Sequence, residues 1–432
     1  MGFSNRKQAR SSFYTKARFL HNFDYESNDI ATIQALLLMC HYYPSMVDQK
    51  HTWFWVHQAI GLAQGAGLHR YCGNIPQRKL WARIWWACLV RDRLIALGTS
   101  RPMHINSLDC SVPLLTVSDL EEDGDSDEDR TVKAIFLELT KLCQYMEGVL
   151  SLPLAAADSI HEQIGLCENT LRHWLSNLDP AAQRCDGFRI APALGTVSTV
   201  YSTLLHLIHN TVLMSLRKFG NEQGDAQPNS PGIASVAADS IALLARLSEL
   251  GLVQFLPTQS VTTILPPLIV QLSSIRCTNP HEYEMANERF QTCMDCLKQL
   301  GETYWHASFY HDFFELAASG SHTRADQETT ARTEESNKHT VDAPNARSFC
   351  LAPLQSASNH TNEKSRQLTE LSPAELPEVD CSMRSLLCKS IGTDASHWDT
   401  SNIEWNSLGD EHNDLNKWLQ DFGFSQSLFP SA

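Results

Sequence analysis

The stretch that decides the fold begins with TIQALLLMCHYY, residues 32–43, and continues with WFWVHQAIGLAQGAGLHR, residues 53–70. The first segment is predicted to be an apolar helix. The second is predicted to be a tryptophan-bearing helix, with Gly67 as a C-cap in the left-handed conformation. Four short motifs follow: RIWW at 83–86, RDR at 91–93, RP at 101–102 and DCSVP at 109–113. None is a recognisable catalytic motif, so function has to be argued from architecture.

Helical periodicity extends over most of the chain. Apolar residues recur at spacings of three and four from Val132 to Val149, and again from Ile160 to Leu178, which places them on one face of a helix. No sustained period-two alternation is present, so the sequence predicts an all-α, multi-helix domain. Further helices are expected over residues 193–219, 233–250, 258–275, 281–300 and 303–317.

Changes in composition suggest the domain organisation. A basic lead-in, residues 1–28, precedes a helical body over residues 29–319. Carboxylates crowd residues 119–130, and Gly, Pro and Asn mark residues 220–232, so both stretches are predicted to be loops. Ser, Thr, Asn, Glu and Pro dominate residues 320–393, which contain too few large apolar residues to offset the entropy of ordering. That stretch is predicted to be disordered.

The last segment, residues 394–432, interleaves acidic residues with large apolar ones. Acidic residues keep such a segment solvated while its apolar groups remain available to a partner's groove, as in acidic activation segments. The alternative is a C-terminal helix, about residues 413–422, that packs on the body. The residues predicted to contact a partner are Trp398, Trp405, Trp418, Leu419, Phe422 and Phe424.

Charge and cysteine usage restrict the class of protein. The chain has 49 acidic and 34 basic residues, a formal net charge of −15, so as a whole it repels a phosphate backbone. Its 13 cysteines are scattered singly, which is typical of reduced, intracellular thiols. Residues 250–275 contain no charge, but Pro257, Pro266 and Pro267 interrupt the run. These residues are therefore predicted to form buried helices and not a membrane span.

None of the candidate catalytic or metal-binding motifs has the residue spacing that such a site requires. His161-Glu162 and His281-Glu282 lack the second histidine of a zincin motif. The acidic residues crowd a loop, whereas a helical terpene cyclase needs carboxylates one turn apart around a cavity. Cys293 and Cys296 have the two-residue gap of a zinc knuckle but no second ligand pair, so they are predicted to be packed thiols. We expect no enzyme, no cofactor and no metal in this chain.

The ordered motifs between residues 32 and 113 resemble the middle homology region of fungal zinc-cluster transcription factors. Within that family they are most similar to the cutinase and fatty-acid responsive regulators. LPP at 265–267 and GETYWHAS at 301–308 agree with this resemblance, which covers about residues 13–319. The resemblance implies a large all-helical regulatory domain of a nuclear factor acting on metabolic genes. Its motif residues here are Gly67, Leu68, His69, Arg70, Arg83, Trp85, Trp86, Arg91, Asp92, Arg93, Arg101 and Pro102.

These motif residues also have a structural interpretation. The tryptophans are large anchors on a helix, and the arginines and Asp92 are expected to snorkel or pair at its edges. His69 is expected to be a hydrogen-bonded turn residue. The family usually has Gly before the RP motif, and Ser100 in its place argues against a strained turn.

One departure from the family concerns DNA. Members carry an N-terminal zinc cluster of six cysteines, whereas this sequence has one cysteine, Cys40, before Cys72. The chain as written is therefore not expected to bind a specific DNA site on its own, and DNA would be reached through a separate domain. The favoured function is a transcription regulator body whose acidic tail recruits transcription machinery. A small-molecule effector and a homodimer remain open. The alternatives are a helical scaffold without DNA binding and, less favoured, an all-α enzyme.

Overall fold

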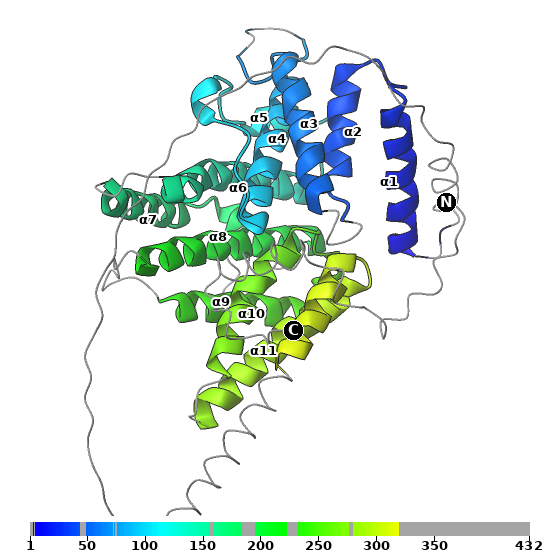
Figure 1. The fold of residues 1–432 in the computed structure, drawn as a ribbon. Helices are drawn as coiled ribbons and strands as arrows, with labels where there is room; N and C mark the ends of the chain where they lie inside the picture. Colours follow the sequence, from blue (N-terminus) through cyan, green and yellow to red (C-terminus); the bar gives the residue numbers. More distant parts are fainter. Residues whose placement is uncertain are drawn as a thin grey trace, which may run out of the picture. The chain divides into compact units, whose positions relative to one another are not determined.

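The computed structural model describes residues 3, 5–43, 49–71, 73, 76–154, 159–183, 195–222, 232–275 and 280–318. Within these ranges every regular element is a helix, which confirms the predicted all-α class (Figure 1). The α-helices are α1 Arg6–Asn22, α2 Asp29–Met39, α3 Gln49–Gly65, α4 Arg78–Thr99, α5 Val117–Leu120, α6 Asp127–Ser151, α7 Ile160–Ser176, α8 Thr196–Glu222, α9 Ile233–Glu249, α10 Ser260–Ser274, α11 Pro280–Gly301, and a last helix over residues 305–318.

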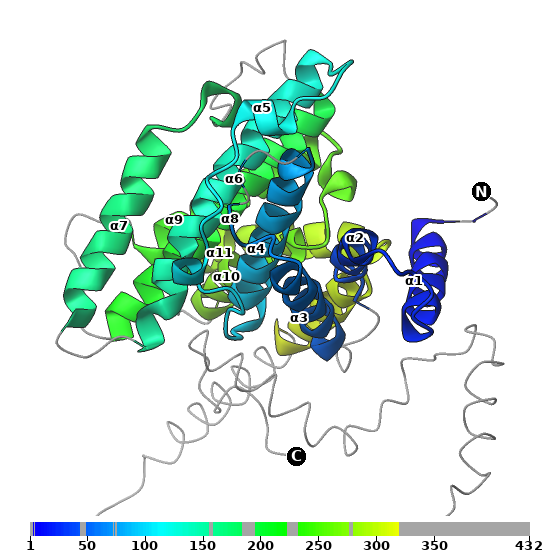
Figure 2. The ribbon, with the colours of Figure 1, turned by 90° about the horizontal axis from the view of Figure 1, so that it is seen from above.

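Most helices pack on helices that are close to them in sequence. α2 packs on α3, α3 on α4, α4 on α6, α6 on α8, and α8 on α9, while α10 and α11 pack on each other and on α9. Figure 2, a view from above, shows α1 and α7 on opposite sides of this group. One continuous hydrophobic core runs from Tyr14 in α1 to Phe314 in the last helix. Phe290 and Phe314 are among its largest fully buried side chains, and burying a side chain of this size contributes about 1.5–3 kcal/mol.

The charge-free stretch forms a 3-10 turn at Val253–Phe255 and then α10, which continues through Pro266 and Pro267; both prolines are buried. A proline inside a helix removes one backbone hydrogen bond, so this helix depends on its packing against α8, α9 and α11. In the described part of the chain, no helix combines the length and the apolarity that a membrane crossing requires.

The acidic run differs from the expected loop over residues 119–130. Asp119 and Asp129 each complete a capping box, with Thr116 at the start of α5 and with Ser126 at the start of α6. Carboxylates are favourable in the first turn of a helix because they face unpaired backbone N–H groups and the positive end of the helix dipole. Only the stretch between Leu120 and Asp127 lies outside a helix. The acidic run therefore supplies capping carboxylates to the first turns of two helices.

The predicted basic lead-in contains α1, a helix that the sequence analysis did not identify. Asn5 caps it by accepting a hydrogen bond from the Gln8 N–H at 2.8 Å. Tyr14 is its one buried residue, and the Tyr14 ring stacks on the Tyr42 ring with centroids 4.3 Å apart. The Trp55 indole N–H donates to the Tyr14 hydroxyl at 3.0 Å. This helix is thus attached to the body, while the boundary at residue 29 stays a prediction.

The remaining domain predictions concern residues that are mostly not described. α8 continues to Glu222, so the predicted loop at 220–232 begins no earlier than residue 223. Residues 223–231, the linker 320–393 and the segment 394–432 lie outside the described residues.

Candidate functional site

The GLHR motif, residues 67–70, forms the turn that ends α3. The N–H of Gly67 donates to the Gln64 carbonyl at 3.0 Å, and the N–H of Leu68 donates to the Ala63 carbonyl at 2.9 Å. These two bonds are a Schellman motif, and Gly67 has φ +82°, which confirms the predicted left-handed C-cap. Leu68, the next residue, is buried with 1% exposure. The turn therefore fixes the chain direction between α3 and α4.

The same turn joins the DCSVP motif, residues 109–113. The N–H of Ser111 donates to the His69 carbonyl at 3.0 Å, and the N–H of Tyr71 donates to the Ser111 hydroxyl at 2.9 Å. The His69 ring accepts from the Arg70 Nε–H at 3.1 Å and lies 5.9 Å from the Trp85 ring. His69 is thus a hydrogen-bonded turn residue, as predicted.

Trp86 holds the other end of that motif. Its indole N–H donates to the Pro113 carbonyl at 2.9 Å, and its side chain is 4% exposed. Trp85, with 1% exposure, is among the largest fully buried side chains. Both tryptophans are therefore the structural anchors that the sequence predicted.

The RDR motif is buried instead of lying at a helix edge. Every residue from Cys88 to Leu97 of α4 is buried, including Arg91, Asp92 and Arg93. A charged side chain without water needs ionic and hydrogen-bonding partners. The expectation that these residues snorkel or pair at the edge of the helix is therefore wrong, because partners on other elements satisfy them within the core.

Asp92 holds the loop that follows α4. Its carboxylate accepts from the backbone N–H of His104 at 2.9 Å and of Ile105 at 3.0 Å, and it lies 3.0 Å from the His104 Nδ1. It also accepts from the Arg93 guanidinium at 2.7 Å. Asp92 thus pairs with the buried Arg93. It also accepts hydrogen bonds from backbone N–H groups of the loop, which have no helix or sheet to pair them.

Arg93 extends this cluster to α6. Its second terminal nitrogen lies 2.7 Å from the Glu147 carboxylate, and the side chain of Arg93 is 0% exposed. The other Glu147 oxygen accepts from the Ser107 N–H at 3.3 Å, and the Ser107 hydroxyl also bonds to Glu147. We call Asp92, Arg93, His104, Ser107 and Glu147 the ionic cluster. It joins α4, α6 and the connecting loop.

Arg91 connects α4 to the end of α2. Its guanidinium donates to the Cys40 carbonyl at 2.8 Å and to the Cys40 sulfur at 3.2 Å. Burial lowers the pKa of Arg91, but Cys40 and Tyr43 more than offset that effect, so its pKa is raised. Arg91 therefore remains charged in the core and ties two helices together.

The RP motif lies against α3. The Arg101 guanidinium is 5.7 Å from the centroid of the Trp53 ring, a cation–π contact, and the Trp53 indole N–H donates to the Pro102 carbonyl at 3.5 Å. Ser100, just before the motif, has φ 51° in the left-handed region. The expectation that a serine argues against a strained turn is therefore wrong. α4 ends in that turn without the glycine usual in the family.

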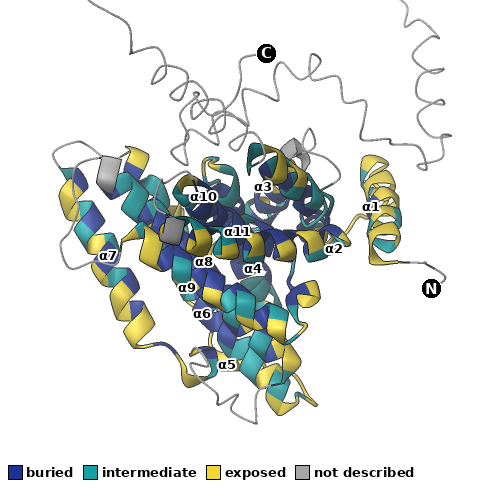
Figure 3. Ribbon diagram, turned by 90° about the horizontal axis from the view of Figure 1, so that it is seen from below, coloured by how far each residue is buried: buried dark blue, intermediate teal, exposed yellow. Residues whose placement is uncertain are grey.

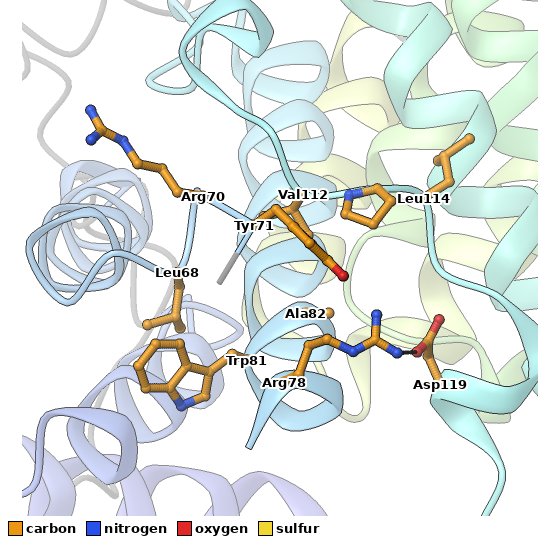
Figure 4. Close-up of a pocket in the computed structure, with 10 residues that line it drawn as sticks. Leu68, Arg70, Tyr71, Arg78, Trp81, Ala82, Val112, Leu114 and Asp119 are labelled. Carbon is orange, nitrogen blue, oxygen red and sulfur yellow. Dashed lines mark hydrogen bonds and ion pairs between the residues drawn. The ribbon is translucent and has the colours of Figure 1, made fainter. Parts of the chain in front are cut away.

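A shallow surface hollow lies between the GLHR turn, the start of α4 and the DCSVP loop (Figure 4). Its empty volume, open solvent included, is about 390 Å³. In Figure 4 the Tyr71 ring and the Arg78 side chain lie over it, and Arg78 is paired with Asp119 at 3.5 Å. The Arg70 side chain extends away from them. The lining residues are Leu68, Arg70, Tyr71, Arg78, Trp81, Ala82, Val112, Pro113, Leu114 and Asp119.

Burial also favours packing for the cysteine pair of α11. Cys293 and Cys296 are both 0% exposed. Burial raises the pKa of Cys293 well above its ordinary value and that of Cys296 to about 12. Zinc binds thiolates, so these protonated thiols fit the predicted role as small apolar core residues.

The structure brings the predicted motif residues into one region but gives most of them structural contacts. Arg83 pairs with Glu122 at 2.7 Å on the surface. Sequence reasoning missed Glu147, Ser107, His104 and Trp53, because contacts of an arginine with residues so far along the chain have no local signal. The six residues of the predicted activation segment lie outside the described residues.

Comparison with known proteins identifies the family. Residues 2–187 match the fungal specific transcription factor domain. The chain is 30% identical to cutinase transcription factor 1 beta of Fusarium vanettenii, with 73% of this chain and 42% of that protein covered. It is 28% identical to cutinase transcription factor 1 alpha of the same organism, with 71% and 35% covered. It is 25% identical to the acetamidase regulatory protein of Aspergillus oryzae, with 79% and 45% covered.

The chain thus spans less than half the length of these relatives. No solved structure gives a significant match. The GLHR turn, the ionic cluster and the DCSVP loop all lie within the matched residues. On this match and these relatives, residues 2–187 of the chain are a fungal specific transcription factor domain.

Proposed function

We propose that this chain is the regulatory body of a fungal transcription factor of the zinc-cluster type that acts in the nucleus on metabolic genes. The family match over residues 2–187 carries the proposal. The names of its relatives, cutinase transcription factor and acetamidase regulatory protein, support a metabolic role. DNA would be bound by a zinc cluster outside this sequence, and we assign no metal or cofactor to the chain itself.

The buried contacts support a structural role for the charged motif residues and not a catalytic one. The charged motif residues of α4 pair with each other, with Cys40 and with Glu147 inside the core, where a substrate has no access. Carboxylates of the acidic run are used in two capping boxes. We therefore assign the chain no enzymatic activity, and its output would be recruitment of transcription machinery through residues 394–432.

A reporter assay tests this output directly. Residues 320–432 and residues 394–432 are each fused to an unrelated DNA-binding domain, and expression of a reporter gene is measured. We expect both fusions to activate. Trp418→Ala with Phe422→Ala should lose most of the activation, because acidic segments act through large apolar groups held available to a partner. A matched control, Ser425→Ala with Ser427→Ala, should keep it. No activation by either fusion would favour a helical scaffold without a transcriptional role.

A further inference from the structure

α1 attaches to the body through one side and leaves the other side open. On the attached side, the Arg10 guanidinium donates to the His41 carbonyl at 2.7 Å and lies 4.6 Å from the centroid of the Tyr304 ring. Tyr14, one turn along, is buried against Tyr42. Figure 3 shows the rest of the helix mostly in the colour of exposed residues.

Large apolar side chains cover the open side. Phe19 is 62% exposed and Phe23 is 70% exposed, and their rings lie against each other with centroids 4.7 Å apart. Exposed aromatic residues are ordinary when they occur singly, but a contiguous group marks an interaction site. We call this group the α1 face; its residues are Phe13, Phe19 and Leu20 on α1, and Phe23 and Tyr25 in the turn that follows it.

The helix that carries the α1 face is strongly basic. It contains five cationic residues and no carboxylate, in a chain whose net charge is −15. Lys16 and Arg18 are exposed on the same helix as Phe13 and Phe19, and the structure gives neither of them an ion pair among the described residues. A partner for this surface therefore needs apolar side chains together with negative charge.

The acidic run near α5 and α6 does not meet this requirement. Asp125 pairs with Lys133 at 2.6 Å, Glu122 pairs with Arg83 at 2.7 Å, and Asp119 and Asp129 are in capping boxes. These carboxylates are thus engaged locally, and no group of large aromatic residues accompanies them.

Residues 394–432 do meet it. We infer that the α1 face is a docking site for this segment of the same chain. The segment carries seven carboxylates and one lysine, and its aromatic residues include Trp398, Trp405, Trp418, Phe422 and Phe424. Residues 319–393 lie between the last described helix and the segment, and a chain of n residues can span up to about 3.3 Å × n, so the segment can reach α1.

Charge makes the other occupants less favourable. A second copy placed symmetrically would bring two basic α1 helices together, and like charges at an interface oppose association. An anionic membrane surface could attract a basic amphipathic helix, but the rest of this chain is acidic. The inference concerns binding alone, so it stands or falls separately from the proposed activation.

Photocrosslinking in the full chain tests the inference. Phe19 is replaced by p-benzoylphenylalanine, the purified chain is irradiated in 0.15 M salt, and crosslinked peptides are identified by mass spectrometry. We expect intramolecular crosslinks to residues 394–432. The same photoreactive residue at Leu166, which is also exposed (66%) but lies on α7, is the matched control and should give none.

Charge reversal supplies the second arm. Lys16→Glu with Arg18→Glu should reduce the crosslinks about tenfold, because two attractive pairs become repulsive. Asp414→Lys with Asp421→Lys in that background should restore them. Crosslinks between isotope-labelled and unlabelled copies would overturn the inference in favour of a dimer. Binding to vesicles containing phosphatidylserine, without tail crosslinks, would overturn it in favour of a membrane, and no crosslinks at all would leave the α1 face without this occupant.

Discussion

α1 and α4 contain the same kinds of residues and use them in opposite ways. Both combine arginines with large aromatic side chains, RKQARSSFYTKARFLHN in α1 and RKLWARIWWACLVRDRLIALGT in α4. α4 buries every residue from Cys88 to Leu97, whereas α1 buries only Tyr14. The difference lies in the neighbours. α4 is packed by α2, α3, α5 and α6, while α1 packs mainly on α2.

Neighbouring elements also decide what each arginine does. Arg93 in α4 has two carboxylates within 2.7 Å, from Asp92 and Glu147. Arg18 in α1 has no ion pair among the described residues. Residue type alone therefore does not separate a structural arginine from a binding one. A partner on another element makes the distinction.

The largest expected effect comes from breaking the ionic cluster of α4. The Arg93 side chain is 0% exposed and pairs with the Asp92 and Glu147 carboxylates. Arg93→Leu would leave both carboxylates without their cation. Removing one partner of a buried ion pair costs about 3–5 kcal/mol, so we expect a loss of that size in the free energy of unfolding. Urea unfolding followed by tryptophan fluorescence measures it.

A surface arginine on the same helix provides the control. Arg83 pairs with Glu122, and the two side chains are 33% and 63% exposed. Exposed ion pairs contribute at most about 1 kcal/mol, so Arg83→Leu should change little. Equal losses for the two variants would show that the ionic cluster is not specially stabilising.

The second prediction concerns the pH dependence of the site where α1 is attached. His306 is 6% exposed, and its ring lies 4.7 Å from the Tyr43 ring. Burial chiefly, and Arg10 of α1 in addition, lower its pKa to about 4, although a hydrogen bond with the Thr258 backbone raises it. The folded pKa is below the unfolded value of about 6.5, so the unfolded state takes up the proton first as the pH falls.

The stability due to neutral His306 is therefore complete above about pH 6.5 and declines as the pH falls toward about 4. Between pH 7 and pH 5 we expect a loss of about 2 kcal/mol from this group. Half-buried His41, whose pKa is lowered to about 2, acts in the same direction. Urea unfolding of His306→Gln at the two pH values should show a smaller difference than the parent chain. His173→Gln, at an exposed position of α7, is the control and should leave the difference unchanged.

The helices of the body could be predicted because their signals are local. The predicted range 233–250 became α9 at Ile233–Glu249, and 281–300 became α11 at Pro280–Gly301. Apolar spacing was sufficient in each case. α1 was not predicted from the sequence, because its apolar residues lie mostly on its exposed side. Its single buried residue, Tyr14, produces no helical periodicity.

The contacts within the candidate site could not be predicted in the same way. The RDR motif was visible, but its burial depends on Glu147, more than fifty residues later, and on Asp92 bonding to the loop at His104. In the acidic run, the order of residues allowed two capping boxes, while composition alone favoured a loop. Composition alone therefore gave the wrong prediction for the acidic run, where the positions of single residues determine the structure.

The third prediction concerns the turn that leads toward α4. Gly67 has φ +82°, and an added Cβ would meet no atom within 4 Å, so a substitution there would be strained by its backbone alone. Gly67→Ala should lower the free energy of unfolding by about 1–2 kcal/mol. Gly61→Ala is the matched control, six residues earlier inside α3 and equally uncrowded. It should raise stability by about 0.5–1 kcal/mol, since Gly is unfavourable in a helix. The same sign for both variants would contradict a left-handed cap.

The smallest effect is expected where α1 and α4 end. Both are followed by a non-glycine residue in the left-handed region, Asp24 at φ 48° and Ser100 at φ 51°. Ser100→Gly relieves about 1–2 kcal/mol of strain but adds freedom to the unfolded chain, so a net gain of about 0.5–1 kcal/mol is expected by thermal unfolding. Asp24→Gly should gain less stability, because aspartate adopts this conformation more readily than serine. The turn after α1 is also held already by a hydrogen bond from the Asp24 N–H to the His21 carbonyl at 3.1 Å. A loss of stability in Ser100→Gly would mean that the Ser100 side chain, and not its backbone, holds the end of α4.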